Sequence, residues 1–155
     1  MATPTLDELQ IIVALPRLAG TAFGITSPKE SRYNCIAWAA GDTRRWWWPR
    51  SGYWPKDVAR QESLEAFVAA FVTLGYAQCD DAHLEPAFDK VALYTVGGKP
   101  RHAARQLPDG AWTSKLGRDH DVTHELRAIE GDVYGTATAF LRRPASPLTE
   151  GKAAG

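Results

Sequence analysis

Apolar residues recur at helical spacing in three segments of the first half of the chain. Residues 6–18 carry apolar side chains three and four positions apart, and Pro16 is expected to stop or kink that helix. A short helix is expected over residues 34–40, where polar residues give way to apolar ones. The clearest helical pattern is "SLEAFVAAFVTLGY", residues 63–76, with Gly75 as its end.

The second half of the chain has the apolar runs and the β-branched and aromatic content of strands. The expected strands are "KVALYTV" (90–96), "RHAARQL" (101–107), "AWTSKLG" (111–117) and "YGTATAFLRR" (134–143). The intervening "VTHELRAIEG", residues 122–131, is expected to form a short helix or a loop. Helices followed by a mostly antiparallel sheet are the α+β pattern, in which the N-terminal helices pack on one face of a small sheet.

The sequence "LPDGA", residues 107–111, predicts a tight hairpin between the second and third of these strands. Pro, Asp and Gly in this order suit a three-residue loop with a bulge. This loop sets Gln106 opposite Trp112 and makes Ser114 the diagonal neighbour of His102. We expect these side chains to share the face of the sheet that points to the core and its helices.

Length and composition fit one globular domain. The 155 residues are 45% hydrophobic and 23% charged, which is ordinary for a chain that buries a sizeable core. We expect one α+β domain over residues 1–143. The tail, residues 144–155, has too few apolar residues to pack and is expected to be disordered.

Charge and hydropathy argue against two classes of partner. The 18 basic and 18 acidic residues balance, and the basic ones form no stripe interleaved with aromatics, so we expect no nucleic-acid partner. No apolar run approaches the roughly 18 residues of a membrane span, and the first residues lack the pattern of a secretory leader. A cytoplasmic location is therefore expected, with the only two cysteines, Cys35 and Cys79, as free thiols.

Cys35 is the first residue to which chemistry can be assigned. It follows Asn34 in the first turn of the expected short helix, where unpaired main-chain N–H groups favour a thiolate and can also receive the oxyanion of acyl transfer. A free cysteine in this position can equally be a small hydrophobe of the core. The position by itself leaves both interpretations open.

A base for Cys35 must come from one of four histidines, and only His102 lies in an expected strand. An inward histidine on a core face can be a purely structural residue. A cysteine at a helix start, a histidine at a strand start and a polar residue on the next strand nevertheless form the nucleophile, base and orienter arrangement that activates thiols. Ser114 is the candidate orienter of the His102 ring. The alternatives are Gln106, Asp119, His120 and Asp121.

The segment "YNCIAWA" resembles the cysteine motif of the NlpC/P60-like branch of papain-like cysteine hydrolases. In that family the cysteine begins a helix, a histidine starts the second strand of a small antiparallel sheet, and a polar residue follows about a dozen positions later. The resemblance implies Cys35 as nucleophile, His102 as general base and Ser114 as orienter. The chain departs from the family where Asn34 replaces the usual Asp and where Ile and Ala replace the Ser and Gly after the cysteine.

Two longer stretches, "NCIAWAAGDTRRWWWP" and "HAARQLPDGAWTSKLG", are also similar to small bacterial proteins of unassigned function. This likeness supports the boundaries of the domain and supplies no substrate.

The tryptophan-rich segment beside Cys35 is the candidate wall of a binding site, although core packing explains it equally well. The candidate substrate-binding residues are Tyr33, Asn34, Trp47, Trp48 and Gln106. His120 and His124 have the spacing of a zinc-binding pair on a helix, but the acids around them favour a solvated turn. We expect no metal and no cofactor.

We interpret the chain as a cysteine hydrolase or acyltransferase, a peptidase or amidase, that attacks an amide, peptide or related acyl bond of a peptide or protein through Cys35. One alternative is a transglutaminase or deamidase that acts on protein glutamine. The other is a non-catalytic module that binds a partner through its tryptophan-rich loop. The oligomeric state is open.

Overall fold

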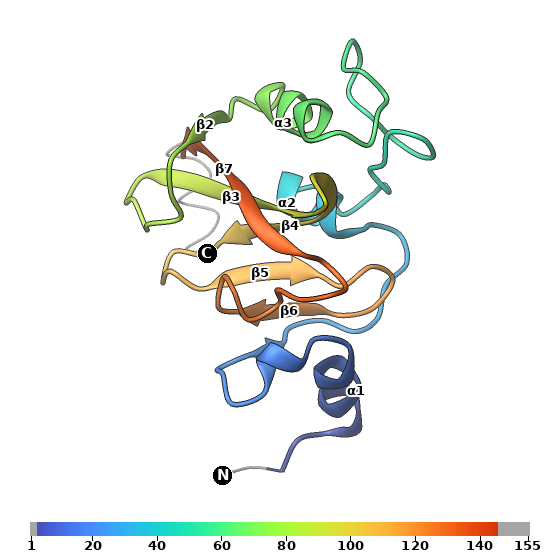
Figure 1. Cartoon of the computed structure of the whole chain (residues 1–155), viewed down its shortest axis with the longest axis vertical. Helices are drawn as coiled ribbons and strands as arrows, with labels where there is room; N and C mark the ends of the chain where they lie inside the picture. Colours follow the sequence, from blue (N-terminus) through green and yellow to red (C-terminus); the bar gives the residue numbers. More distant parts are fainter. Residues whose placement is uncertain (1–2, 146–155) are drawn as a thin grey trace.

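A computed structural model describes residues 3–145 of the chain (Figure 1). Its helices are α1 (Leu6–Ala14), the 3-10 helix η1 (Pro16–Leu18), α2 (Cys35–Ala40) and α3 (Leu64–Val72). Its strands are β1 (Gly24–Ile25), β2 (Ala77–Cys79), β3 (Phe88–Val96), β4 (Lys99–Gln106), β5 (Trp112–Lys115), β6 (Asp121–His124) and β7 (Thr136–Pro144). No helix within residues 3–145 has the length and apolar character needed to cross a bilayer.

The strands form one seven-stranded sheet in the order β1-β6-β5-β4-β3-β7-β2, and every neighbouring pair is antiparallel. Strand β4 lies in the middle with the long strand β3 beside it, and the two-residue strand β1 and the three-residue strand β2 form the edges. Figure 1 shows α1 beyond β6 at one end of the molecule and α3 beside β2 at the other. The fold is therefore α+β with an open antiparallel sheet, as the pattern of helices and strands predicts.

The three predicted helices are present, and local signals explain their ends. Thr5 caps α1 with a capping box, in which its side chain accepts from the main-chain N–H of Glu8 and its own N–H donates to the Glu8 carboxylate. Pro16 separates α1 from η1, as expected from its missing N–H. The helix α3 starts after Ser63, whose side chain accepts from the N–H of Ala66.

Both faces of the sheet are buried, each under its own hydrophobic cluster. Along β3, Val91 and Leu93 belong to the cluster that contains α2 and α3, whereas Ala92 and Tyr94 belong to the cluster that contains Ile11 of α1. Successive residues of a strand point to opposite faces. α2 and α3 therefore pack against one face, and Ile11 of α1 joins the cluster on the other face. The nearly continuous apolar run of β3 is typical of a strand buried on both sides.

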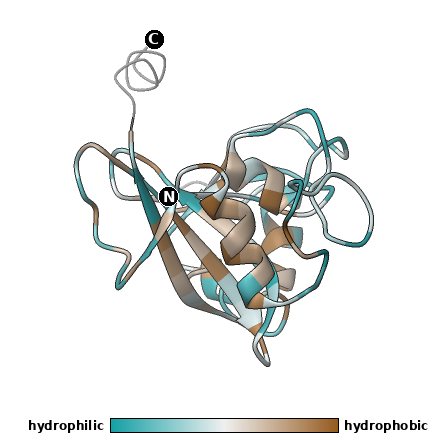
Figure 2. Cartoon of the chain, turned by 90° about the horizontal axis from the view of Figure 1, so that it is seen from above, coloured by the Kyte–Doolittle hydropathy of each residue, from teal (hydrophilic) through white to brown (hydrophobic). Residues whose placement is uncertain are grey.

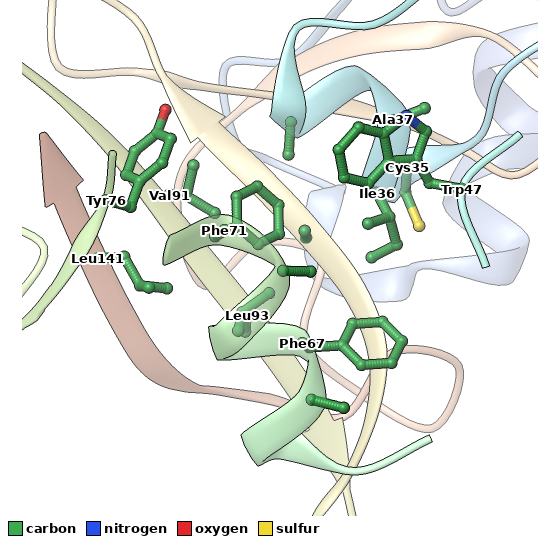
Figure 3. Close-up of a cluster of buried hydrophobic side chains, with 14 of the residues drawn as sticks. Cys35, Ile36, Ala37, Trp47, Phe67, Phe71, Tyr76, Val91, Leu93 and Leu141 are labelled. Atoms are coloured by element: carbon green, nitrogen blue, oxygen red, sulfur yellow. The ribbon is translucent and has the colours of Figure 1, made fainter. Parts of the chain in front are cut away.

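The hydropathy of the chain follows this layering. Hydrophobic residues gather on the helices and on the strands beneath them, and the long loops are mostly hydrophilic (Figure 2). On the α3 side, Phe67 and Phe71 lie over the strands that carry Val91, Leu93 and Leu141 (Figure 3).

The predicted hairpin between β4 and β5 is confirmed with its register. Gln106 pairs with Trp112, and the N–H of Leu107 donates to the carbonyl of Ala111 over 2.7 Å. Gly110 adopts a φ of +93°, the left-handed conformation that the loop requires.

Three strands differ from the sequence expectation. Residues 121–124 form β6 instead of a short helix or loop, because they pair along the whole of β5. The short edge strands β1 and β2 were not expected, since two or three residues are too few to show an alternation.

The end of the domain also differs from the expectation. Strand β7 includes Pro144, which was assigned to the tail, and the N–H of Ala145 donates to the carbonyl of Ala87 over 2.8 Å. The rest of the expected disordered tail, residues 146–155, lies outside the described residues.

Gly135 and Gly97 make a matched pair for testing the close packing of the loop before β7. Both have positive φ, +78° and +57°, but a Cβ on Gly135 would lie 1.8 Å from the carbonyl oxygen of Thr95, whereas a Cβ on Gly97 would meet no atom within 4 Å. We expect Gly97→Ala to cost about 1 kcal/mol of left-handed strain and Gly135→Ala to cost about 3 kcal/mol, because overpacking adds to the strain. Urea unfolding of both variants measures the difference, and equal losses would contradict the close approach.

Candidate active site

Asn34 fixes the start of α2 and the loop that follows it. Its Oδ1 accepts from the main-chain N–H of Ala37 over 3.1 Å and from that of Trp47 over 3.2 Å, and its Nδ2 donates to the Trp47 carbonyl over 2.8 Å. Asn34 is buried, so this one amide holds the helix cap and the tryptophan-rich loop together. All of these contacts are within the fold.

Cys35 is the first residue of α2, as predicted, and its side chain is buried with 7% exposure. Figure 3 shows its sulfur beside Ile36 and Trp47 in the cluster under α2. Burial raises the pKa of the thiol to about 11 and outweighs the main-chain N–H groups of Ala103, Ile36 and Cys35 that act to lower it. Burial therefore favours the protonated thiol over the thiolate that the helix start would stabilise.

His102 is held by Ser114, as the hairpin register predicts. The His102 Nε2 and the Ser114 Oγ are 2.8 Å apart, and both side chains are fully buried. The imidazole stacks on the ring of Tyr134 at 3.9 Å between centroids and meets Tyr94 edge-on at 5.4 Å. Burial, followed by the nearby His124, holds the pKa of His102 well below its ordinary value, so the ring is neutral.

Ser114 also bonds a second buried histidine. Its Oγ lies 2.7 Å from the Nε2 of His124, whose Nδ1 lies 2.7 Å from the carbonyl oxygen of Glu125. Burial lowers the pKa of His124 to about 4, so this ring is neutral as well near pH 7. Two neutral imidazoles and one hydroxyl thus form a chain of hydrogen bonds that ends on a main-chain carbonyl.

The carbonyl of Glu125 fixes the position of every proton in this chain. Since a carbonyl only accepts, His124 Nδ1 donates to it, and the Nε2 of the neutral ring must accept. Ser114 therefore donates its hydroxyl proton to His124 and accepts from the Nε2–H of His102. The lone pair of His102 is left on Nδ1, which is buried and has no hydrogen-bond partner.

The structure does not make the expected bond between His102 and Cys35. The thiol lies against the main chain of Ala103, the next residue along β4, and Ala103 belongs to the α2 cluster. His102 points to the opposite face, where its neighbours Tyr94 and Tyr134 pack with the other cluster. The face that carries His102 and Ser114 is thus not the face that α2 covers.

The remaining candidates for orienting His102 bond elsewhere. Gln106 donates to the carbonyl of Ala82 over 3.1 Å, and Asp121 accepts from the hydroxyl of Tyr33 over 2.8 Å. Among the candidates named from the sequence, Ser114 is the one that bonds the His102 ring. His124 bonds Ser114 in turn. The sequence spacing predicts a helix or a turn at His124, but the residue lies in β6. The pairing of β6 with β5 puts His124 opposite Trp112, two residues from Ser114.

The candidate substrate-binding residues beside Cys35 are all engaged within the fold. Trp47 is buried and its Nε1 donates to Asp42 over 2.9 Å. Trp48 packs edge-on against Phe67 at 5.3 Å between centroids. The Tyr33 hydroxyl is bonded to Asp121, as described above. In the described part of the chain, no three His, Cys, Asp or Glu side chains converge as a metal site would require.

The fold and the site define a class of protein: an α+β domain with a buried thiol at a helix start and a buried His–Ser–His chain in the adjoining sheet. The sequence matches the model of a domain of unknown function (DUF7689) over residues 24–142. Because this match covers more than half of the chain, the protein belongs to the DUF7689 family. Searches of curated proteins and of solved structures found no match.

Removing the Ser114 hydroxyl breaks the chain between the two imidazoles. Ser114→Ala leaves two buried ring nitrogens without their partner, and we expect the free energy of unfolding to fall by about 1–3 kcal/mol. Ser51→Ala, at an exposed turn, serves as the control and should change it by less than about 0.5 kcal/mol. Urea unfolding measures both variants. A Ser114→Ala variant as stable as the control would show that the hydrogen bonds of Ser114 to the two histidines do not contribute to stability.

The buried histidines predict a loss of stability in mild acid. Between pH 6.5 and the value of about 4 to which the pKa of His124 is lowered, the unfolded chain binds more protons than the folded one. The free energy of unfolding should therefore fall as the pH drops, by about 1.4 kcal/mol per pH unit for this histidine. His102 acts in the same direction. Urea unfolding at pH 7, 6 and 5 measures the slope.

Two variants identify the source of that slope. His124→Gln should reduce the pH dependence of the free energy of unfolding by about 1.4 kcal/mol per pH unit. His83→Gln should leave this dependence unchanged, because the His83 side chain is 86% exposed. A slope that survives His124→Gln in full would contradict the assignment.

Proposed function

We propose that this chain is a cysteine-dependent hydrolase or acyltransferase of the papain-like, NlpC/P60-type class, in which Cys35 is the nucleophile and His102 the general base. The observation that carries the proposal is the proton arrangement of the buried chain. Ser114 fixes the His102 ring through Nε2 and leaves the lone pair on Nδ1 without a partner. His102 precedes Ala103 in the sequence, and the main-chain N–H of Ala103 contacts the Cys35 thiol and acts to lower its pKa.

Because both groups are neutral, the reaction would proceed by general-base catalysis, without a preformed thiolate–imidazolium pair. The Cys35 thiol gives its proton to His102 Nδ1 while the sulfur bonds to the acyl carbon and the carbonyl electron pair moves onto oxygen. His102 then passes the proton to the leaving amine as the C–N bond breaks, which leaves a thioester on Cys35. A water molecule that loses a proton to His102 attacks this thioester, and the thiol is restored with that proton.

The proposal requires a rearrangement that includes the main chain of β4, because Cys35 lies on the α2 face of the sheet and the His102 ring on the opposite face. Cys35 Sγ and His102 Nδ1 must come within hydrogen-bond distance when a substrate binds, since the contact is not made in the resting arrangement. Catalytic hydrogen bonds that tighten only in the substrate complex are a common property of such sites. Hydrolysis and acyl transfer share every step up to the thioester, so a transglutaminase or deamidase would differ only in the group that attacks it.

A specific observation favours a second candidate, a non-catalytic module. The Cys35 side chain is almost fully buried, and burial raises the pKa of its thiol to about 11. An inert structural cysteine has these two properties. In that case the half-buried Trp46, which has the Arg118 guanidinium 5.3 Å from its ring, is the part of the tryptophan-rich loop offered to a partner.

Labelling of the folded protein with an acyloxymethyl ketone probe separates the two candidates. If Cys35 is the nucleophile, the probe should modify Cys35 in the native protein, as located by peptide mass spectrometry. Cys35→Ser should abolish the labelling, His102→Ala should slow it at least about a hundredfold, and Ser114→Ala about ten- to a hundredfold, because the base contributes factors of this size.

Cys79→Ser is the matched control, since it removes the other thiol and should leave the labelling of Cys35 unchanged. Melting temperatures recorded beside the rates separate loss of chemistry from loss of folding. A Cys35 that reacts only in denaturant, or at a rate that His102→Ala leaves unaltered in a folded variant, would establish the non-catalytic candidate instead.

A further inference from the structure

A second site lies apart from Cys35, in a cavity of about 170 Å³ between α1 and the turn that joins β5 to β6. Its apolar wall includes Ile11, Leu15 and Leu116, and its polar wall includes Asp7, Asp119 and His120. The cavity is smaller than the pockets that hold whole drug-sized ligands, so it suits a single side chain or head group. The helix α1 lies outside the residues that match the DUF7689 family.

His120 aims an unused nitrogen into this cavity. The residue is only 7% exposed, and its Nε2 is buried and has no hydrogen-bond partner. Its Nδ1 lies 2.8 Å from the carbonyl oxygen of Ser27, so Nδ1 carries a proton and donates it. In the neutral ring, Nε2 is then an acceptor.

Two carboxylates flank that acceptor. The Nε2 of His120 lies 3.6 Å from the Oδ2 of Asp7 and 3.6 Å from the Oδ1 of Asp119, and both distances exceed that of a hydrogen bond. These three acceptors line the same cavity. The Oδ1 of Asp119 also accepts from the main-chain N–H of His120 over 3.1 Å, whereas the Nε2 of His120 has no hydrogen-bond partner within the described residues. Buried acceptors of this kind are stabilised when a hydrogen-bond donor, and above all a cation, binds to them.

The Asp119 side of the cavity is built by the chain and is not a mobile loop tip. The buried Lys115 donates its Nζ to the main-chain carbonyls of Asp119, Gly117 and Glu30. The N–H of Glu30 in turn donates to the carbonyl of Asp119 over 3.4 Å. These contacts tie the turn to a distant segment and fix where the Asp119 carboxylate stands.

We propose that this cavity binds a primary ammonium group on an alkyl stem. An ammonium carries three N–H donors around one charge, which matches the three acceptors of Asp7, Asp119 and His120. The apolar wall would cover the methylene stem, as protein interiors do for lysine.

The cavity is a binding site in its own right and does not depend on Cys35 being a nucleophile. It adjoins the candidate active site, because Tyr134 lines the cavity and stacks on His102 at 3.9 Å. A lysine side chain and a polyamine both offer the required group.

The test is a titration of the full chain with n-butylammonium, followed by the main-chain amide signals of residues 116–121 in NMR spectra. We expect saturable shifts of these signals, and no comparable shifts with 1-butanol, which keeps the stem and lacks the charge. Asp119→Asn and Asp7→Asn should each weaken binding about tenfold, the value of one charged hydrogen bond. Nα-acetyl-lysine methylamide and spermidine, titrated in parallel, distinguish the two sources of the amine.

Two controls make the result specific. Asp80→Asn removes an exposed carboxylate from the other end of the sheet, and Cys35→Ser removes the candidate nucleophile; neither should change the affinity. Asp7→Asn decides the matter if Asp119→Asn fails to fold, because Asp7 is half exposed and lies at the rim. The proposal is overturned by equal binding of 1-butanol, by an equal loss in Asp80→Asn, or by signals that respond to pH alone, which would mean that the three acceptors hold only a proton.

Discussion

The burial of the central strands on both faces is the constraint on which the rest of this structure depends. The buried side chains of β3 and β4 alternate between the α2–α3 cluster and the α1 cluster, so a polar group beneath either cluster is shielded from water. A polar side chain that enters this sheet must find its partner inside the protein. Lys90 illustrates the rule: it is fully buried, and its Nζ reaches the carbonyl of Asp81 over 3.1 Å and the carboxylate of the same residue over 3.3 Å.

The same constraint produces the His–Ser–His chain and its electrostatic character. His102 and His124 are too deeply buried to carry charge, so they stay neutral and satisfy each other through the Ser114 hydroxyl. The network has one terminal acceptor, the carbonyl of Glu125, and therefore one arrangement of protons. Its free end is a basic lone pair on His102 Nδ1. Cys35 is subject to the same burial, which keeps its thiol protonated and makes proton transfer part of any attack.

The cavity beside α1 contains a buried polar atom for which the described residues supply no hydrogen-bond partner. His120 is buried and its Nδ1 donates to the carbonyl of Ser27, but its Nε2, which lies 3.6 Å from the carboxylates of Asp7 and Asp119, has no hydrogen-bond partner within the described residues. The two candidate sites thus have opposite needs. In our proposals, the base of the first site takes a proton from a thiol, and the acceptors of the second bind a cation. Tyr134 forms the wall between them.

Local chemistry in the sequence determined much of this protein by itself. The Pro16 break, the start of α2 at Cys35 and the register of the β4–β5 hairpin follow from short-range sterics and turn geometry, and that register correctly joined His102 to Ser114. Tertiary structure alone decided which helices cover which face, because an apolar run such as that of β3 looks the same whether one side or both are covered. It also decided the pairing of β6, and with it the place of His124, and it set the pKa of Cys35 through burial, which a helix start cannot reveal. These features depend on contacts between segments far apart in the chain, whereas caps and turns depend on neighbours a few residues away.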